Sequence, residues 1–294
     1  MEQTIPGEFR IQAYRNRRFQ NWIIIGFLYS LFYMTRYNLA ANASSLMNTF
    51  GWTKQDYGIF EVILPLVYGL AVVVNGPLAD KFGGKKAFLF GAVGVIIMNF
   101  LFGAAGFLIK SPAIWNGKEL VTSPTLLLGF SKSSLLWTMA IIWGINGYFQ
   151  AFGALSIVKI NAQWFHIRER GTFGAIFGVL IRFGLILSFS ITPLIAVFFN
   201  SWRWAFWIPA ILVTIFFFLT LFFVKDTPGE AGYTDLDTGD GSDISVEKVK
   251  ISEVLQKVFA SKVMWMIGIG SMMIGFVRRS IVDAWYPLYF KEVF

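Results

Sequence analysis

The sequence predicts an all-α membrane protein, and its composition is the first reason. Hydrophobic residues make up 56% of the 294 residues, phenylalanine alone occurs 32 times, and charged residues account for only 14%. A soluble domain carries about 25% charged residues, so this chain lacks the polar surface that a soluble protein presents to water. The second reason is that the apolar residues gather in long stretches, as they do in helices that cross a bilayer.

About seven of these stretches are long enough to cross roughly 30 Å of hydrocarbon as helices. They are residues 22–41, 57–78, 87–109, 135–158, 172–198, 204–224 and 263–289. Membrane β-strands are disfavoured because the runs exceed about 10 residues and do not alternate between apolar and polar positions. The first stretch follows an arginine-rich segment and is too long for a signal peptide, so we expect it to be a retained helix.

Basic residues predict the orientation of the chain. Most of them fall on alternate connections: Arg10, Arg15, Arg17 and Arg18, then Lys81, Lys85 and Lys86, then Lys159, Arg168 and Arg170. The positive-inside rule places these connections, and with them the N-terminus, in the cytoplasm. The loop after the third stretch runs against this pattern, since it holds Lys110, Lys118 and Lys132.

The spacing of the stretches predicts three parts. Residues 1–224 would form a six-helix half, residues 225–262 a polar cytoplasmic linker, and residues 263–294 one further helix. The linker contains Asp235, Asp237, Asp240 and Asp243 among glycines and serines. Such a composition is typical of a flexible connection.

Several classes of protein are disfavoured by composition. The net charge of +8 is not accompanied by a nucleic-acid-binding motif, so we expect no nucleic-acid partner. There is no cysteine and only one histidine, His166, so neither a thiolate nor a histidine metal site is expected. We predict no metal, no cofactor and no enzymatic activity. His166 lies in a basic loop, where a role in proton relay is disfavoured.

The loop after the second stretch carries a recognisable pattern, Gly-Pro-Leu-Ala-Asp-Lys-Phe-Gly-Gly-Lys-Lys at residues 76–86. Glycines permit a tight turn, and mixed charges suit a helix end. An ordinary positive loop would have a similar composition. The order of residue types, however, resembles the signature of the major facilitator superfamily in this loop. That resemblance implies a fold of twelve helices and a latch between two halves, formed here by Asp80, Gly83 and Lys85.

Arg36 lies inside the first stretch, where an arginine costs roughly 2.5–3.5 kcal/mol on insertion scales, so a function is the default interpretation. It shares one helix face with four neighbours at helical spacing: Tyr29, Tyr33, Tyr37 and Ala40. This face would offer a cation and several hydroxyls to a water-filled cavity. The alternative is an arginine that snorkels to the interface beside an aromatic belt.

A second buried cation, Arg279, lies in the seventh stretch, with Arg278 beside it. A guanidinium presents a planar fork of donors that matches phosphate oxygens, which lysine does not. Two arginines from opposite halves would suit a phosphate monoester with a charge of about −1.5 to −2. One of the pair could instead balance Asp283, and the spacing does not decide between them.

A narrower resemblance follows from two segments, Tyr-Met-Thr-Arg-Tyr-Asn at residues 33–38 and Arg279 with Trp-Tyr-Pro-Leu-Tyr-Phe-Lys-Glu at residues 285–292. Both resemble the organophosphate:phosphate antiporters, which include glycerol-3-phosphate and hexose-6-phosphate carriers. The resemblance implies that Arg36 and Arg279 bind phosphate and that Tyr29, Tyr33 and Tyr68 lie near it. It implies exchange of a small organic phosphate for inorganic phosphate in the lipid bilayer of the bacterial inner membrane.

The sequence departs from that family at two positions. Val72 stands where the family has a lysine, and Ile181 stands where it has a histidine. Arg182 follows at once, in an otherwise apolar helix. One hypothesis is that Arg182 supplies the missing charge as a substrate-binding residue. The equal alternative is a structural arginine bonded to backbone carbonyls.

Two rival functions remain at this point. A proton-coupled carrier of hexuronate-like carboxylates would share the Arg-x-Asn element and the Trp164…Glu169-Arg170-Gly171 pattern. A transporter-like membrane sensor of sugar phosphates would share the whole sequence pattern. The resemblance further implies about five more helices after residue 294, so we expect a fragment whose partner is the remaining C-terminal half. The alternative is that the partner half is a separate polypeptide.

Overall fold

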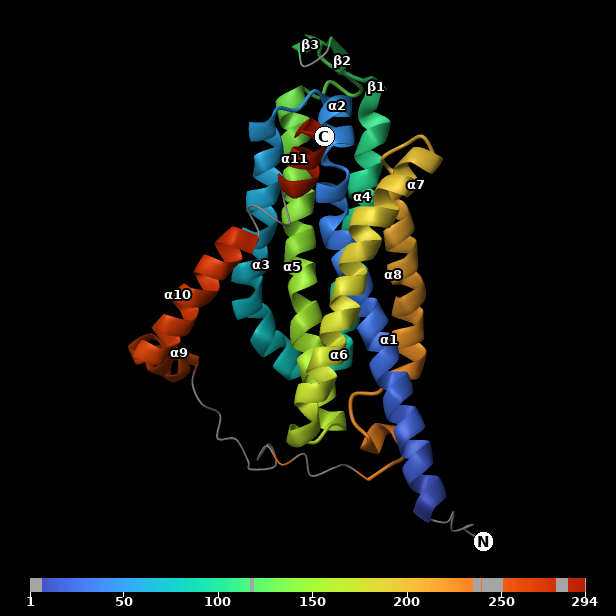
Figure 1. Ribbon diagram of the computed structural model, residues 1–294, viewed down its shortest axis with the longest axis vertical. Helices are drawn as coiled ribbons and strands as arrows, with labels where there is room; N and C mark the ends of the chain where they lie inside the picture. The colour runs from blue at the N-terminus through green and yellow to red at the C-terminus, as the bar shows by residue number, and fades with distance from the viewer. Residues whose placement is uncertain (1–6, 117–118, 235–238, 240–250, 279–284, 294) are drawn as a thin grey trace. The chain divides into compact units, whose positions relative to one another are not determined.

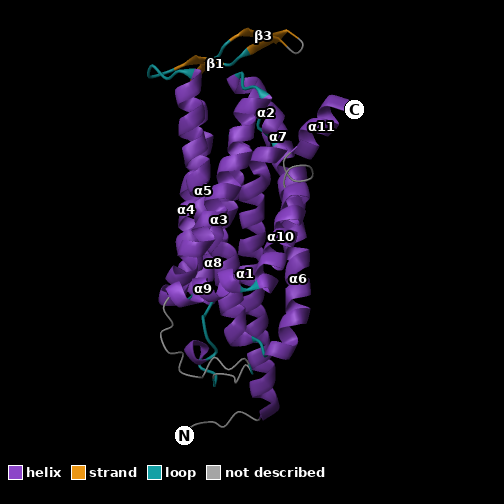
Figure 2. Cartoon of the chain, turned by 90° about the vertical axis from the view of Figure 1, so that its left-hand side faces the viewer, coloured by secondary structure: helices purple, strands orange, loops and turns teal. Residues whose placement is uncertain are grey.

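The computed structural model describes residues 7–116, 119–234, 239, 251–278 and 285–293 (Figure 1). The chain divides into two units, residues 1–237 and 238–294. The first unit consists almost entirely of long helices, which run side by side in both views (Figures 1 and 2). Their bounds are Gly7–Ala41 (α1), Ala43–Phe50 (α2), Lys54–Phe82 (α3), Gly84–Ala104 (α4), Lys132–Trp164 (α5), Ile167–Ile186 (α6), Thr192–Phe198 (α7) and Trp204–Phe223 (α8).

Five helical segments of the described residues are long and apolar enough to cross a membrane. They are residues 54–82, 84–108, 132–164, 167–198 and 204–223. The first predicted span lies in α1, which reaches fifteen residues further toward the N-terminus than residue 22. α1 is less apolar than these five segments, because its C-terminal half carries polar residues such as Thr35, Arg36 and Asn38.

Capping groups and glycines explain where the helices begin and end. Thr53 and Asp56 exchange hydrogen bonds of 3.2 and 2.8 Å in a capping box that starts α3. Ser131 and Ser134 do the same at the start of α5. Gly83, with φ of 86°, lets the chain pass directly from α3 into α4, because L side chains rarely adopt that conformation.

The fifth predicted span is interrupted. A π-helical segment, η2 (Leu187–Ile191), separates α6 from α7. Its Ser188 hydroxyl donates to the Met34 carbonyl of α1 at 3.3 Å. Gly184 lies so close to α1 that an added Cβ would meet the Ser30 carbonyl oxygen at 2.2 Å. The absence of a side chain therefore lets α6 pack tightly against the helix that carries Arg36.

Four short strands, which the sequence did not predict, follow α4 and the 3₁₀ turn η1 (Ala105–Leu108). They are Ile109–Ser111 (β1), Ile114–Asn116 (β2), Glu119–Thr122 (β3) and Thr125–Leu126 (β4). β1 pairs with β4 and β2 with β3, both antiparallel. The strands lie at the end of the first unit opposite the N-terminus (Figure 2). The Trp115 indole donates to the Asn48 carbonyl at 2.9 Å, which fastens this small cap to α2.

The second unit contains Ile251–Ala260 (α9), Lys262–Val277 (α10) and Tyr286–Val293 (α11). The expected linker, residues 225–262, therefore includes a helix, α9, and a 3₁₀ turn, η3 (Gly229–Ala231). Ser261 caps α10 by accepting from the Met264 amide at 3.4 Å. Arg279, the predicted phosphate ligand of the seventh span, lies outside the described residues.

Candidate functional site

Arg36 lies in the interior of the first unit, against α5. Its Nε and Nη2 both donate to Oε1 of Gln150, at 3.3 and 3.2 Å. Gln150 is fully buried, and its Nε2 donates to the Thr35 hydroxyl at 3.0 Å. Thr35 in turn donates to a backbone carbonyl of α1, 3.1 Å away. A buried amide thus fixes the direction of the guanidinium.

Two aromatic rings enclose the same guanidinium. Its Cζ lies 4.8 Å from the centroid of the Tyr33 ring and 4.7 Å from that of Tyr68, on α3. Contacts of this kind contribute about 0.5–2 kcal/mol, more when water is excluded. Tyr33 also touches Tyr29 edge-on at 5.3 Å and stacks on Tyr37 at 5.9 Å. The predicted group of Arg36, Tyr29, Tyr33 and Tyr68 therefore comes together in space.

No carboxylate among the described residues forms an ion pair with Arg36. Its neighbours are neutral: an amide and phenol rings. An uncompensated cation in a membrane helix is costly, which makes Arg36 a candidate functional residue. Because Nε and Nη2 are engaged by Gln150, the Nη1 edge is the part of the guanidinium that makes no hydrogen bond within the described chain.

A seam of three buried asparagines, Asn38, Asn99 and Asn146, links α1 to α4 and α5. The Asn38 amide donates to Oδ1 of Asn99 at 3.0 Å, and the Asn99 amide donates to Oδ1 of Asn146 at 3.3 Å. All three side chains are fully buried. Hydrogen bonds between side-chain amides of different helices help hold membrane bundles together, because lipid supplies no hydrophobic force between helices. The seam ties α1, α4 and α5 next to the Arg36–Gln150 pair, and sequence spacing gave no sign of it.

Arg182 is placed differently from Arg36. It lies on α6 with an exposed side chain, and within the described residues it makes no hydrogen bond or ion pair. The expected alternative of bonds to backbone carbonyls is therefore not seen there. Ile181 faces a groove, described below, and is partly buried. No hydrogen bond, ion pair or cation–π contact joins Arg182 to Arg36 or to the tyrosines around it.

The predicted latch residues make contacts inside the first unit. Asp80 forms an ion pair with Lys159 of α5, whose Nζ also donates to the Ala79 carbonyl at 3.1 Å. The Lys85 backbone amide donates to Asp226 at 2.7 Å, and its Nζ donates to the Leu221 carbonyl at 2.8 Å. Sequence reasoning treated Lys159 as an ordinary basic residue at a helix end and did not identify Asp226.

Asp226 lies just after α8, where the chain is hydrogen-bonded to neighbouring helices. Burial raises the pKa of its carboxyl, and the hydrogen bond from Lys85 partly offsets that rise. The preceding residue, Lys225, exchanges backbone hydrogen bonds of 3.2 and 2.8 Å with the Asn21 side chain. Trp164 donates to the Lys225 carbonyl at 3.0 Å. The exit from α8 is thereby fixed to α1, α4 and α5.

The Trp164…Glu169-Arg170-Gly171 pattern also has a structural explanation. Glu169 pairs with Arg18 at 2.8 Å, which joins α6 to α1. Arg170 donates to the Ala162 and Phe165 carbonyls at 2.8 and 3.2 Å, so it satisfies carbonyls at the end of α5. His166 accepts from the Arg168 amide at 3.2 Å and begins α6. Glu169 and Arg170 therefore join α6 to its neighbouring helices, and His166 caps the start of α6.

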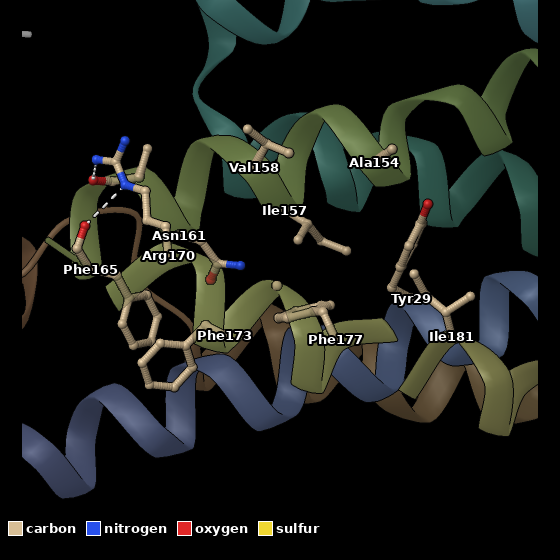
Figure 3. Close-up of a pocket in the computed structure, with 12 residues that line it drawn as sticks. Tyr29, Ala154, Ile157, Val158, Asn161, Phe165, Arg170, Phe173, Phe177 and Ile181 are labelled. Carbon is tan, nitrogen blue, oxygen red and sulfur yellow. Dashed lines mark hydrogen bonds between the residues drawn. The ribbon is translucent and has the colours of Figure 1, made fainter. Parts of the chain in front are cut away.

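A groove of about 340 Å³ runs between α5 and α6 and reaches α1 (Figure 3). Tyr29 and Ile181 lie at one end of it, and Phe165, Phe173 and Arg170 lie at the other. Most of the lining is apolar. Tyr29 is the residue that the groove and the Arg36 cluster share.

Comparison with known proteins gives the family. The Major Facilitator Superfamily model matches residues 25–294. The glycerol-3-phosphate transporter of Bacillus subtilis is 28% identical over 95% of this chain and 59% of its own length. A probable hexose phosphate transport protein of Chlamydia muridarum is 25% identical over 96% of the chain and 59% of its own length. The membrane sensor protein UhpC of Salmonella typhimurium is 23% identical over 95% of the chain and 58% of its own length.

The fold has a counterpart among solved structures. A partially occluded, inward-open conformation of the xylose transporter XylE from E. coli matches 69% of this chain and 49% of its own, with a TM-score of 0.52 and 18% identity. The chain thus spans about three fifths of the length of its curated relatives. A family model that covers residues 25–294 and a matching helical bundle lead to one conclusion: the chain belongs to the major facilitator superfamily.

Proposed function

We propose that this protein acts in a secondary transporter that exchanges a small organic phosphate for inorganic phosphate. The observation that carries the proposal is Arg36, a cation in the interior of the bundle that is held by Gln150 and by two tyrosine rings and has no carboxylate partner among the described residues. An anion with several acceptor oxygens would compensate this charge. The glycerol-3-phosphate and hexose phosphate transporters among its relatives support phosphate as that anion.

The mechanism we propose is alternating access about a site near the bilayer midplane. Arg36 would grip one edge of the phosphate through Nη1, and Arg279, which lies outside the described residues, would be the second ligand that the family resemblance implies. An empty site with two facing guanidinium groups resists closure, because like charges repel in a medium of low dielectric constant. Bound phosphate, inorganic or organic, removes that repulsion, so the site can close and reorient only when it is loaded. Exchange is therefore favoured over uniport. Asp80, Gly83 and Lys85 would steady the end of the bundle during the movement.

The test is exchange of labelled phosphate. The protein encoded by the whole reading frame is placed in liposomes loaded with labelled phosphate and challenged with glycerol-3-phosphate, glucose-6-phosphate or a hexuronate. We expect efflux with an organic phosphate, and we expect Arg36→Lys to weaken it about ten- to a hundredfold, because lysine loses charged hydrogen bonds and the planar fork. Hexuronate uptake driven by a proton gradient, with no phosphate exchange, would contradict the proposal.

A sensor is the second candidate, and one relative favours it, the membrane sensor protein UhpC. A sensor would keep the Arg36 site and bind a sugar phosphate without moving it. Saturable binding with no exchange would therefore assign the protein to this class. A partner protein that responds to the bound state would then be sought.

A further inference from the structure

Cations from two different helices meet at the C-terminal end of α8. The Arg17 guanidinium of α1 donates to the Phe223 carbonyl at 2.7 Å, and the Lys85 ammonium of α4 donates to the Leu221 carbonyl at 2.8 Å. These carbonyls belong to the last turn of α8 and have Cα atoms about 5 Å apart, so the two cations are held near each other. Lys225, just after the helix, lies within electrostatic reach of Lys85, as Arg17 does. We call Arg17, Lys85 and Lys225 the basic cluster.

The nearby carboxylates do not neutralise the basic cluster. Asp226 accepts from the Lys85 backbone amide at 2.7 Å, and Glu230 accepts from the Asp226 backbone amide at 3.1 Å. Both carboxylates are therefore engaged by backbone amides, and none of the ion pairs between described residues includes a member of the cluster. Three cations beside two carboxylates leave a surplus of positive charge. An anion from outside the described chain would offset it.

The basic cluster also lies where the apolar surface of the bundle ends. α1 and α4 both pack along α8, and the lower end of α8 lies beside α1 in Figure 1. Phe218 and Phe222, one turn apart on α8, are 49% and 67% exposed, so the outer face of this helix remains apolar up to the cluster. Cations that follow exposed aromatic surface at the end of an apolar helix are typical of the boundary between hydrocarbon and lipid headgroups. An ammonium or a guanidinium has more donors than the contacts of Arg17 and Lys85 use, and the Lys225 ammonium makes no hydrogen bond to a described residue.

We propose that the basic cluster is a site for the headgroup phosphate of an anionic phospholipid, whose acyl chains lie along the exposed phenylalanines of α8. A lipid fits better than a free phosphate, because its chains cover apolar surface that a soluble anion leaves bare. The bound lipid would tie the end of α8 to α1 and α4. Residues 17 and 36 lie on one continuous helix, about 28 Å apart at 1.5 Å per residue, so this site is distinct from the Arg36 site and does not depend on the substrate.

Lipid binding to the purified protein tests the proposal. The protein encoded by the whole reading frame is delipidated in detergent and titrated with phosphatidylglycerol or with phosphatidylcholine of the same acyl chains, and native mass spectrometry counts the bound lipids. We expect one phosphatidylglycerol to bind about fivefold or more tightly than phosphatidylcholine, whose own ammonium is repelled by the cluster. Inorganic phosphate is expected not to displace it, since it buries no apolar surface.

Two double substitutions provide a matched pair. Arg17→Gln with Lys225→Gln removes two cations of the cluster, and we expect phosphatidylglycerol to bind about twenty- to thirtyfold more weakly. Arg15→Gln with Arg168→Gln removes the same charge from exposed positions near the same end of the bundle and is expected to weaken binding less than about threefold. If the first variant does not fold, Lys225→Gln alone leaves the contacts of Arg17 in place and is expected to cost about fivefold.

The outcomes separate a lipid site from its alternatives. Equal losses in the two double variants would mean that general surface charge attracts the lipid, and would overturn the site. Equal affinity for phosphatidylglycerol and phosphatidylcholine would also overturn it. Displacement of the lipid by inorganic phosphate would make the cluster a site for free anions instead. Specific lipid binding by a protein that binds no inorganic or organic phosphate at Arg36 would overturn the proposed function and leave the lipid site standing.

Discussion

Arg36 and Arg182 are both arginines inside membrane helices, and their surroundings differ in almost every respect. Arg36 is enclosed by Tyr33 and Tyr68 and donates twice to Gln150. Arg182 is exposed on α6 and makes no hydrogen bond or ion pair with the described residues. Both are cations in apolar runs; sequence analysis favoured a function for Arg36 and left a functional and a structural role for Arg182 equally open. What separates them is the polar partner supplied by another helix.

The comparison teaches that preorganisation distinguishes a binding cation. A guanidinium fixed on one edge keeps its remaining donors pointed in one direction, so less conformational entropy is lost when an anion binds. An exposed arginine has to be ordered by the ligand itself. The following changes test whether the partners of Arg36, and not the mere presence of a cation, decide binding.

Gln150 should show the largest effect. Gln150→Glu places a carboxylate where the amide oxygen accepts from Arg36, so it neutralises the cation and repels phosphate; we expect a loss of about a hundredfold or more in phosphate affinity. Gln150→Leu removes the acceptor without adding charge and is expected to cost about tenfold. Equilibrium binding of labelled phosphate measures both. Equal, small effects of the two substitutions would show that Gln150 does not position Arg36.

Tyr68 should show a smaller effect that depends on its ring. Tyr68→Leu removes the aromatic face 4.7 Å from the Arg36 guanidinium, and a cation–π contact of about 0.5–2 kcal/mol corresponds to roughly two- to thirtyfold in affinity. Tyr68→Phe keeps the ring and loses only the hydroxyl. Binding that is lost in Tyr68→Phe to the same degree as in Tyr68→Leu would assign the role to the hydroxyl.

Sequence analysis found one half of this site and missed the other for a physical reason. Arg36, Tyr33 and Tyr29 lie on one helix, where a period of 3.6 residues determines which side chains share a face. Gln150 and Arg36 are separated by 114 positions, and no local pattern determines which residues of two helices will meet. Helix packing determines that. The Asp80–Lys159 ion pair was missed for the same reason.

The irregular parts show the same limit. Long apolar runs predicted the membrane helices, because hydrocarbon thickness and backbone hydrogen bonding leave few other structures. The strands between residues 109 and 126 were not predicted, since their paired segments are only two to four residues long. The π-helical segment was also missed. Its Ser188 donates to the Met34 carbonyl of α1, a contact between helices that the local sequence does not reveal.

Arg182 should show the smallest effect, and for that reason it is the most direct check on the comparison. Arg182→Gln removes a cation from an exposed face of α6 while it leaves Gln150, Tyr33 and Tyr68 in place. Since no described residue orients this side chain, binding would have to order it, and we expect phosphate affinity to change less than about threefold. Binding and exchange are measured beside Arg36→Lys in the same liposomes. A loss as large as that of Arg36→Lys would mean that the exposed face of α6 lies against the bound anion, and the partners of Arg36 would then no longer be what distinguishes the two arginines.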